Sequence, residues 1–280
     1  MALGEEVLAG VVRVESGSGR GTVTFAVMTR YFLEVAYRGT AYSGFQTQEN
    51  AITIQSELER CLAVLHRFSF SLTGSSRTDA GVHARQNFFH FDSERDLHPQ
   101  LLYKLNAILP AEVVVRNVYR VSAEAHCRFD AVSRQYGYRI YSRKDPFLMD
   151  RSYYFPYTLN LHRMQKAATV LMGYSDFTSF SKRNTQVKSF ECRLEQSEWV
   201  REGEEWVYRV RANRFLRGMV RALTSTMLLV GREKIDLPEF QNIIESKNCE
   251  LASFAVPAHG LFLEEVIYPD SLLKNCISLS

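Results

Sequence analysis

The chain has 280 residues, 46% of them hydrophobic, and a formal net charge of +3 at pH 7. It is long enough to bury a sizeable core, as one large or two ordinary domains. No apolar run approaches the roughly 20 residues that span a bilayer. The five cysteines are scattered and contain no CxxC pair, which argues against a metal centre of the usual spacing. We expect a cytoplasmic protein without a membrane-spanning segment.

The first predicted unit, residues 29–125, follows a glycine- and serine-rich stretch within residues 1–28 that is typical of a flexible extension. A helix is predicted where apolar residues recur at three- and four-residue spacings behind a possible Thr53 cap. Alternating apolar runs predict strands on both sides of it. The expected order is strand Tyr31–Tyr37, helix Ile52–Arg67, strands Phe68–Thr73 and Gln86–Phe91, helix Pro99–Leu109 and strand Val113–Val121.

The second predicted unit, residues 126–280, permits a similar order. Asp236 followed by Glu239 is a capping-box pattern that predicts the start of a short helix. Together the units predict an α/β (α+β) protein with two β-α-β-β-α-β halves of the ferredoxin-like type. The expected elements are strand Gln135–Tyr141, helix Asn160–Met172, a hairpin of Arg193–Val200 and Glu205–Ala212, helix Arg214–Val230 and strand Leu261–Tyr268.

Charge is strongly segregated along the chain. Six arginines and no acidic residue lie between Trp206 and Arg232, whereas six glutamates lie between Glu191 and Glu205. Cations neutralise phosphates and aromatic rings stack on unpaired bases, so basic stretches with interleaved aromatics favour RNA as a partner. A second basic stretch surrounds several tyrosines and contains Arg128, Arg134, Arg139, Arg143, Lys144 and Arg151.

The segment Gly74-Ser-Ser-Arg-Thr-Asp-Ala-Gly-Val-His-Ala84 concentrates charge and turn residues that no hydrophobic core requires. Arg77 and Asp79 lie two residues apart, and Gly74 and Gly81 permit a tight turn. A cation beside Asp79 would favour the carboxylate, the form that acts as a nucleophile or general base. An ordinary turn with a surface ion pair is the alternative interpretation.

This segment resembles the signature of the TruA-type tRNA pseudouridine synthases, with a match of eight consecutive residues from Arg77 to Ala84. Ser76 stands where that family often has glycine, and further similarity covers most of the chain, from about Arg30 to Pro269. The resemblance implies two RRM-like halves whose mainly antiparallel sheets join and flank a basic cleft. It also implies a homodimeric isomerase that converts uridine to pseudouridine at positions 38, 39 and 40 of the tRNA anticodon stem-loop, without a metal or nucleotide cofactor.

The resemblance also assigns roles to individual residues. Asp79 corresponds to the catalytic carboxylate, and whether it attacks C1′, attacks C6 or removes the C2′ proton stays open. Arg77 would hold Asp79 and occupy the place of the flipped uridine. Tyr136 would stack on the target base, whereas its neighbour Tyr138 is expected in the core. Arg221 would reach Asp79 or the target phosphate, and the expected RNA contacts are Arg211, Arg214, Arg217, Gln46 and His83, the last of which could instead hold the loop.

Two other functions fit parts of the pattern. A non-catalytic RNA-binding protein could use the same basic surfaces, but a carboxylate near phosphate would repel its ligand. A metal-dependent nuclease would need clustered carboxylates, which the sequence lacks.

A helix is expected after Asn213. Its arginines Arg214, Arg217 and Arg221 are spaced by three and four residues, so they are predicted to share one face.

Overall fold

The computed structural model describes residues 28–183, 187–274 and 277–278. The predicted flexible extension, apart from its last residue, lies outside the described residues. None of the helices in the described ranges is long and apolar enough to cross a membrane.

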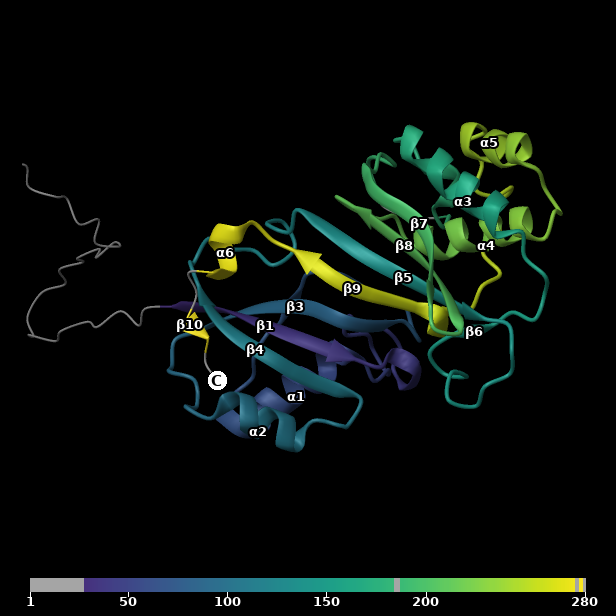
Figure 1. Ribbon diagram of the computed structural model, residues 1–280. Helices are drawn as coiled ribbons and strands as arrows, with labels where there is room; N and C mark the ends of the chain where they lie inside the picture. The colour runs from purple at the N-terminus through teal and green to yellow at the C-terminus, as the bar shows by residue number, and fades with distance from the viewer. Residues whose placement is uncertain (1–27, 184–186, 275–276, 279–280) are drawn as a thin grey trace, which may run out of the picture.

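The first half of the chain forms β1, β3 and β4 with two helices, close to the predicted order (Figure 1). Thr53 caps α1 as expected, because its side chain accepts the N–H of Ser56 while the Ser56 hydroxyl accepts the N–H of Thr53. The elements are β1 (Thr29–Tyr37), α1 (Ile54–His66), β2 (Thr73–Gly74), β3 (His83–Ser93), α2 (Leu101–Ile108) and β4 (Val113–Val121).

The second half also follows the predicted order, and its short helix begins behind Asp236 with the expected capping box to Glu239. Two short elements, α6 and β10, follow the last long strand. The elements are β5 (Ser133–Tyr141), β6 (Tyr153–Tyr154), α3 (Leu161–Val170), β7 (Leu194–Glu202), β8 (Glu205–Ala212), α4 (Met219–Gly231), α5 (Leu237–Glu245), β9 (Leu261–Ile267), α6 (Asp270–Lys274) and β10 (Ile277–Ser278).

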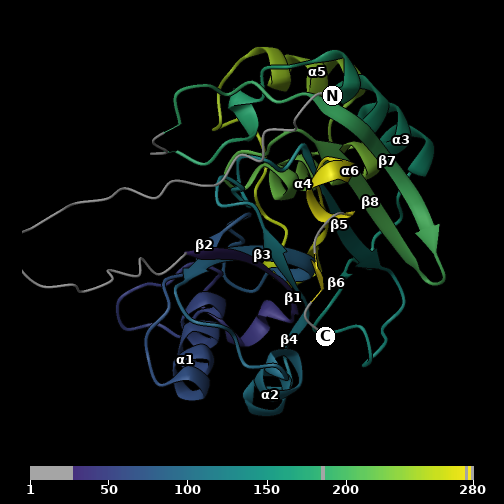
Figure 2. The same ribbon diagram turned by 90° about the vertical axis from the view of Figure 1, so that its left-hand side faces the viewer.

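The ten strands within the described residues belong to one mainly antiparallel sheet, whose main path runs β10-β4-β1-β3-β9-β5-β8-β7. The two halves meet where β3 pairs with β9 in parallel, at His83–Phe262 and Ala84–Leu263. Figure 1 shows α1 and α2 at one end of this sheet and α3, α4 and α5 at the other, and Figure 2 shows the same separation from the side. The implied joining of the two sheets is confirmed.

Each half has its own buried cluster, and residues cross the junction in both directions. Val82, at the end of the first half's loop, packs in the cluster of the second half. Leu263 and Val266 of β9 pack in the cluster of the first half. The division at residues 125 and 126 stays a prediction, since the sheet and both cores continue across it.

Two predicted elements differ from the structure. The strand predicted at Phe68–Thr73 is wrong except at its end, because only Thr73 and Gly74 pair with β3. The ring of Phe70 instead packs edge-on against Phe91 with centroids 5.2 Å apart. The helix predicted from Arg214 begins only at Met219, because Gly218 has a φ of +76° and interrupts the backbone.

Candidate active site

The signature loop, residues 75–82, joins β2 to β3 at the junction of the two halves. It closes in a turn in which the Val82 N–H donates to the carbonyl of Asp79 at 3.2 Å. Gly81 has a φ of +79°, which a residue with a side chain rarely adopts. The predicted tight turn around Asp79 is therefore present.

Buried polar side chains hold the loop against the sheet. The hydroxyl of Tyr37 on β1 lies 2.7 Å from the hydroxyl of Thr78. The Asn87 amide donates both to that Tyr37 hydroxyl at 3.2 Å and to the Ser76 carbonyl at 2.8 Å. Because these groups are withdrawn from water, each bond lost would leave an unpaired buried polar atom. The loop is thus fixed before any substrate arrives.

His83 anchors the end of the loop and is only 1% exposed. Its Nδ1 accepts the Gly39 N–H at 3.1 Å, so Nε2 carries the proton and donates to the Asp150 carbonyl at 3.1 Å. Burial lowers the pKa of this imidazole, which keeps it neutral. The ring also stacks on Phe262 at 4.6 Å. The buried position of His83 fits the loop-holding alternative, and its expected contact with RNA stays a prediction.

The cation beside Asp79 is Lys182, which the sequence analysis did not select. Its Nζ lies 3.8 Å from Oδ2 of Asp79, and both side chains are about a third exposed. The Lys182 N–H donates to the Arg217 carbonyl at 2.9 Å. The stem of Lys182 crosses Gly218, where a Cβ atom would lie 3.0 Å from its Cγ. Because Gly218 has no side chain, there is room for the Lys182 side chain to pass over it and reach Asp79.

Arg77 does not form the expected ion pair with Asp79 within the part of the chain that the structure describes. Its side chain is exposed and lines a neighbouring pocket instead. Arg77 therefore faces the pocket, while Lys182 pairs with Asp79.

Tyr136 lies on β5 beside the loop and packs against the hydrophobic clusters of both halves. The Phe215 ring stands edge-on to it, with centroids 5.0 Å apart and planes at 81°. Burial raises the pKa of Tyr136 to about 12; the charge of Arg134 acts against this rise, and the Asp79 carboxylate makes a smaller contribution in its favour. Tyr138, two residues on, is fully buried as predicted and donates to the Pro257 carbonyl at 2.7 Å.

Arg134 links the loop to the second half and was not singled out from the sequence as a site residue. Its guanidinium donates to the Ser76 hydroxyl at 3.4 Å, to the Asn213 carbonyl at 3.2 Å and to the Arg128 carbonyl at 2.7 Å. Burial lowers its pKa, and the described residues give it no carboxylate partner. Its charge thus adds to the positive potential around Asp79.

The expected arginine cluster is only partly assembled. Arg214 and Arg217 precede Gly218 and lie off α4, so the shared helical face predicted for them with Arg221 is wrong. Arg221 donates through Nε and Nη2 to the Val256 carbonyl at 3.0 and 2.7 Å and forms no ion pair with Asp79 among the described side chains. Arg211 is held by the Gln135 amide and by Glu265, 3.8 Å away.

One arginine of the second basic stretch is neutralised by acidic residues. Arg139 is 9% exposed and contacts Glu202 at 2.9 Å and Glu264 at 3.2 Å. Burial acts against its charge, yet the carboxylates of Glu264, Glu202 and Glu205 raise its pKa. This arginine stabilises the sheet rather than facing a ligand.

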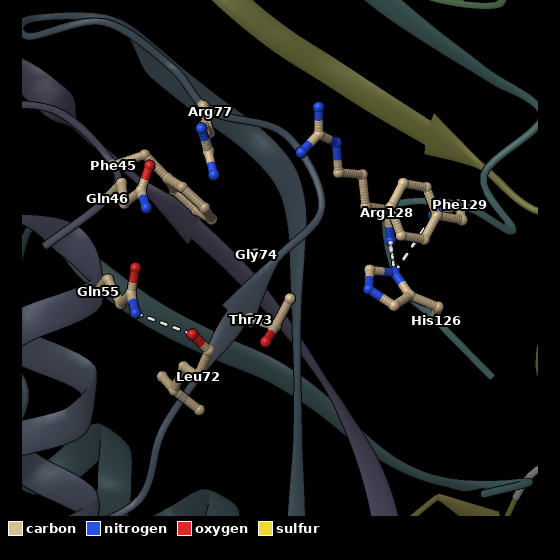
Figure 3. Close-up of a pocket in the computed structure, with 10 residues that line it drawn as sticks. All are labelled: Phe45, Gln46, Gln55, Leu72, Thr73, Gly74, Arg77, His126, Arg128 and Phe129. Atoms are coloured by element: carbon tan, nitrogen blue, oxygen red, sulfur yellow. Dashed lines mark hydrogen bonds between the residues drawn. The ribbon is translucent and has the colours of Figure 1, made fainter. Parts of the chain in front are cut away.

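A pocket of about 240 Å³ opens beside the signature loop (Figure 3). Gln46, one of the expected RNA contacts, lines it together with Arg77. Asp79 and Tyr136 are not among its lining residues, so it is distinct from the surroundings of the carboxylate. The pocket is lined by Phe45, Gln46, Gln55, Leu72, Thr73, Gly74, Arg77, His126, Arg128 and Phe129.

The fold brings His90, His126 and Cys127 together, with candidate ligand atoms within 4.8 Å of one another, although the sequence showed no such cluster. His126 Nδ1 accepts the N–H groups of Arg128 and Phe129 at 3.1 and 3.4 Å. A metal on Nε2 would need a proton on Nδ1, where these donors already point. Burial raises the pKa of Cys127 to about 12, which keeps it a thiol. The arrangement suits internal hydrogen bonding better than metal binding.

Comparison with known proteins identifies the family. The family model described as tRNA pseudouridine synthase matches residues 167–269. The chain is 44% identical to tRNA pseudouridine synthase A of Parabacteroides distasonis over 88% of its own length and 98% of that protein. It is 42% identical to the Porphyromonas gingivalis protein of that name, over 88% and 99% of the two chains. It is 38% identical to the Staphylococcus aureus JH1 protein of that name, over 88% of this chain and 94% of that protein.

The chain belongs to the tRNA pseudouridine synthase family. Members of this family are isomerases that convert uridine to pseudouridine. The matched family model does not include the signature loop, but the relatives named above align over most of the chain.

Replacing Lys182 tests its contact with Asp79. We expect Lys182→Met to lower kcat by roughly tenfold, less than the ~100-fold typical of a lost transition-state donor, because both partners are partly solvated. Lys182→Arg should retain most of the rate. Arg183→Met is the matched control, because this adjacent cation pairs with Glu250 instead. Equal rates for Lys182→Met and Arg183→Met would rule out the assigned role.

The pKa of Tyr136 leads to a spectroscopic prediction. Since its folded-state pKa of about 12 exceeds the ordinary value near 10, Tyr136 should stay protonated when an exposed tyrosine is half ionised. The difference in tyrosinate absorbance between wild type and Tyr136→Phe should be absent up to pH 10. A clear ionisation difference at or below that pH would show that Tyr136 is solvated like an exposed tyrosine.

Proposed function

We propose that this chain isomerises uridine to pseudouridine at positions 38, 39 and 40 in the anticodon stem-loop of tRNA, acting as a cytoplasmic homodimer. The observation that carries the proposal is one partly exposed carboxylate, Asp79, held in a rigid loop beside Lys182 and Tyr136. Within the described residues, the exposed side chains of Arg77 and Arg217 form no ion pair. Arg77 stands two residues before Asp79, and the Arg217 carbonyl accepts the Lys182 N–H. These arginines suit a polyanionic substrate.

The reaction needs no cofactor, because every atom of the uracil is retained except one exchanged proton. The C1′–N1 bond breaks, the base turns, a C1′–C5 bond forms, and the proton on C5 leaves while N1 gains one. Asp79 supplies the carboxylate that assists cleavage, at C1′, at C6 or at the C2′ proton. Lys182 orients that carboxylate through its ammonium group.

Tyr136 provides an aromatic face for the detached base and, by closing the site with Phe215, limits the entry of water. Its raised pKa keeps the Tyr136 hydroxyl protonated at neutral pH, so Tyr136 does not act as a base on its own. Asp79 therefore removes the proton from C5, either directly or through Tyr136. In the second case, the Tyr136 hydroxyl gives up its own proton while it accepts the proton from C5.

Extrusion of the target nucleotide costs a few kcal/mol, which contacts to the backbone and the stem must offset. Arg77 is exposed beside the loop and can occupy the vacated place in the stem. Arg214 and Arg217 border the loop that carries Lys182 and can contact phosphates. Arg211 and Arg221 already have protein partners, so any part that they take in RNA binding requires these contacts to be exchanged.

A non-catalytic RNA-binding protein is the second candidate. It is disfavoured because Asp79 is a partly exposed anion within otherwise basic surroundings, where it would weaken phosphate binding. Mapping pseudouridine by carbodiimide modification and primer extension in tRNA treated with the protein separates the two. We expect new stops at positions 38 to 40, whereas a binder would produce none.

Affinity provides a second test. We expect Asp79→Ala to bind tRNA within a few-fold of wild type, because phosphate contacts supply most of the binding free energy. Glu250→Ala, which removes a surface carboxylate of the Arg183 ion pair, is the control. Filter binding at fixed salt measures both. A folded Asp79→Ala protein that no longer binds tRNA would assign Asp79 to RNA binding instead.

A further inference from the structure

The pocket of about 240 Å³ beside the signature loop has no role in the mechanism above, although it shares Arg77 with that site. Figure 3 shows Arg77 on one side of it and His126, Arg128 and Phe129 on the other. Because Asp79 and Tyr136 lie outside its lining, the uridine that reacts does not fill it.

The charge of the pocket points to an anion. Arg77 and Arg128 are both exposed, and neither has a carboxylate within ion-pair distance among the described residues. The lining itself contains no acidic residue. Two unpaired guanidinium groups around one hollow favour a phosphate group, which such groups bind through paired hydrogen bonds.

The aromatic residue at the rim points to a base. Phe129 is 74% exposed, which is costly for so large an apolar ring in water. The Phe129 ring packs against the His126 ring, with centroids 4.2 Å apart. The Arg128 guanidinium lies 5.8 Å from the centroid of the Phe129 ring. The ring is thus held in place while one face stays accessible. Such rings are platforms on which unpaired bases stack.

The lining also offers a polar group for a base edge. Gln46 is exposed, and its amide has no hydrogen-bond partner among the described residues, whereas Gln55 is occupied by the Leu72 carbonyl and Glu59. An amide presents both a donor and an acceptor. This combination of cations, an aromatic face and a free amide matches the parts of a single nucleotide.

We propose that this pocket binds a second, unpaired nucleotide of the RNA substrate, with its base on Phe129 and its phosphate between Arg77 and Arg128. The inference rests on the proposed function, since it takes tRNA as the ligand. Because Arg77 lines the pocket and stands two residues before Asp79 in the loop, it would separate the uridine at Asp79 from the nucleotide in the pocket. Two unpaired nucleotides held on either side of one arginine would fix the register of the RNA.

The test measures tRNA affinity and turnover of the full-length protein. We expect Phe129→Ala to weaken binding by roughly 5- to 150-fold, the range for loss of one base–aromatic stack. The loss should fall more on Kd and KM than on kcat, and Phe129→Tyr should restore binding. Tyr103→Ala, which removes a 73% exposed aromatic from α2 outside the pocket, is the control and should bind normally. Arg128→Ala should reduce the salt dependence of binding by about one ion.

Single 2-aminopurine substitutions along the anticodon stem-loop locate the nucleotide. We expect wild type to quench the fluorescence at one position other than the reacting uridine, Phe129→Ala to lose that quenching and Phe129→Tyr to keep it. Affinity of Phe129→Ala equal to that of Tyr103→Ala, or a loss confined to kcat, would overturn the proposal. Absence of pseudouridine with wild type, together with Phe129-dependent binding, would instead overturn the proposed function and leave the pocket's role standing.

Discussion

The parallel pairing of β3 with β9 is the constraint on which the rest of this structure depends. It joins strands from opposite ends of the chain, at His83–Phe262 and Ala84–Leu263, and turns two helix-covered sheets into one. Hydrophobic residues cross the same junction, Leu263 into one core and Val82 into the other. Separating the halves would therefore expose both cores and break the sheet, so the junction is held by burial as well as by hydrogen bonds.

The junction also determines the chemistry. The signature loop ends where β3 meets β9, and β5 follows β9 in the sheet, which sets Tyr136 opposite Leu263 and one strand away from the loop's end. Lys182 arrives from the second half over Gly218 to meet Asp79. The carboxylate therefore comes from one half and its cation and aromatic neighbour from the other. Neither half alone contains the site.

Local chemistry in the sequence predicted much of this molecule. The caps at Thr53 and Asp236 were readable because the groups that satisfy a helix end lie three residues away. The helix predicted from Arg214 failed because apolar spacing does not reveal the positive φ of Gly218. Arg77 was expected to pair with Asp79 because it is close in sequence, whereas Lys182 is close only in space. Such a contact depends on the sheet junction, which no local pattern encodes, and the family resemblance supplied the joining of the sheets.

The central claim is that Asp79 is the carboxylate that isomerises uridine. The most direct measurement is tritium release from tRNA containing 5-tritiated uridine, compared between wild type and Asp79→Asn under single-turnover conditions. We expect release by wild type and none by the variant, because asparagine keeps the shape of the side chain but lacks the carboxylate. Release by Asp79→Asn at a rate near that of wild type would contradict the claim.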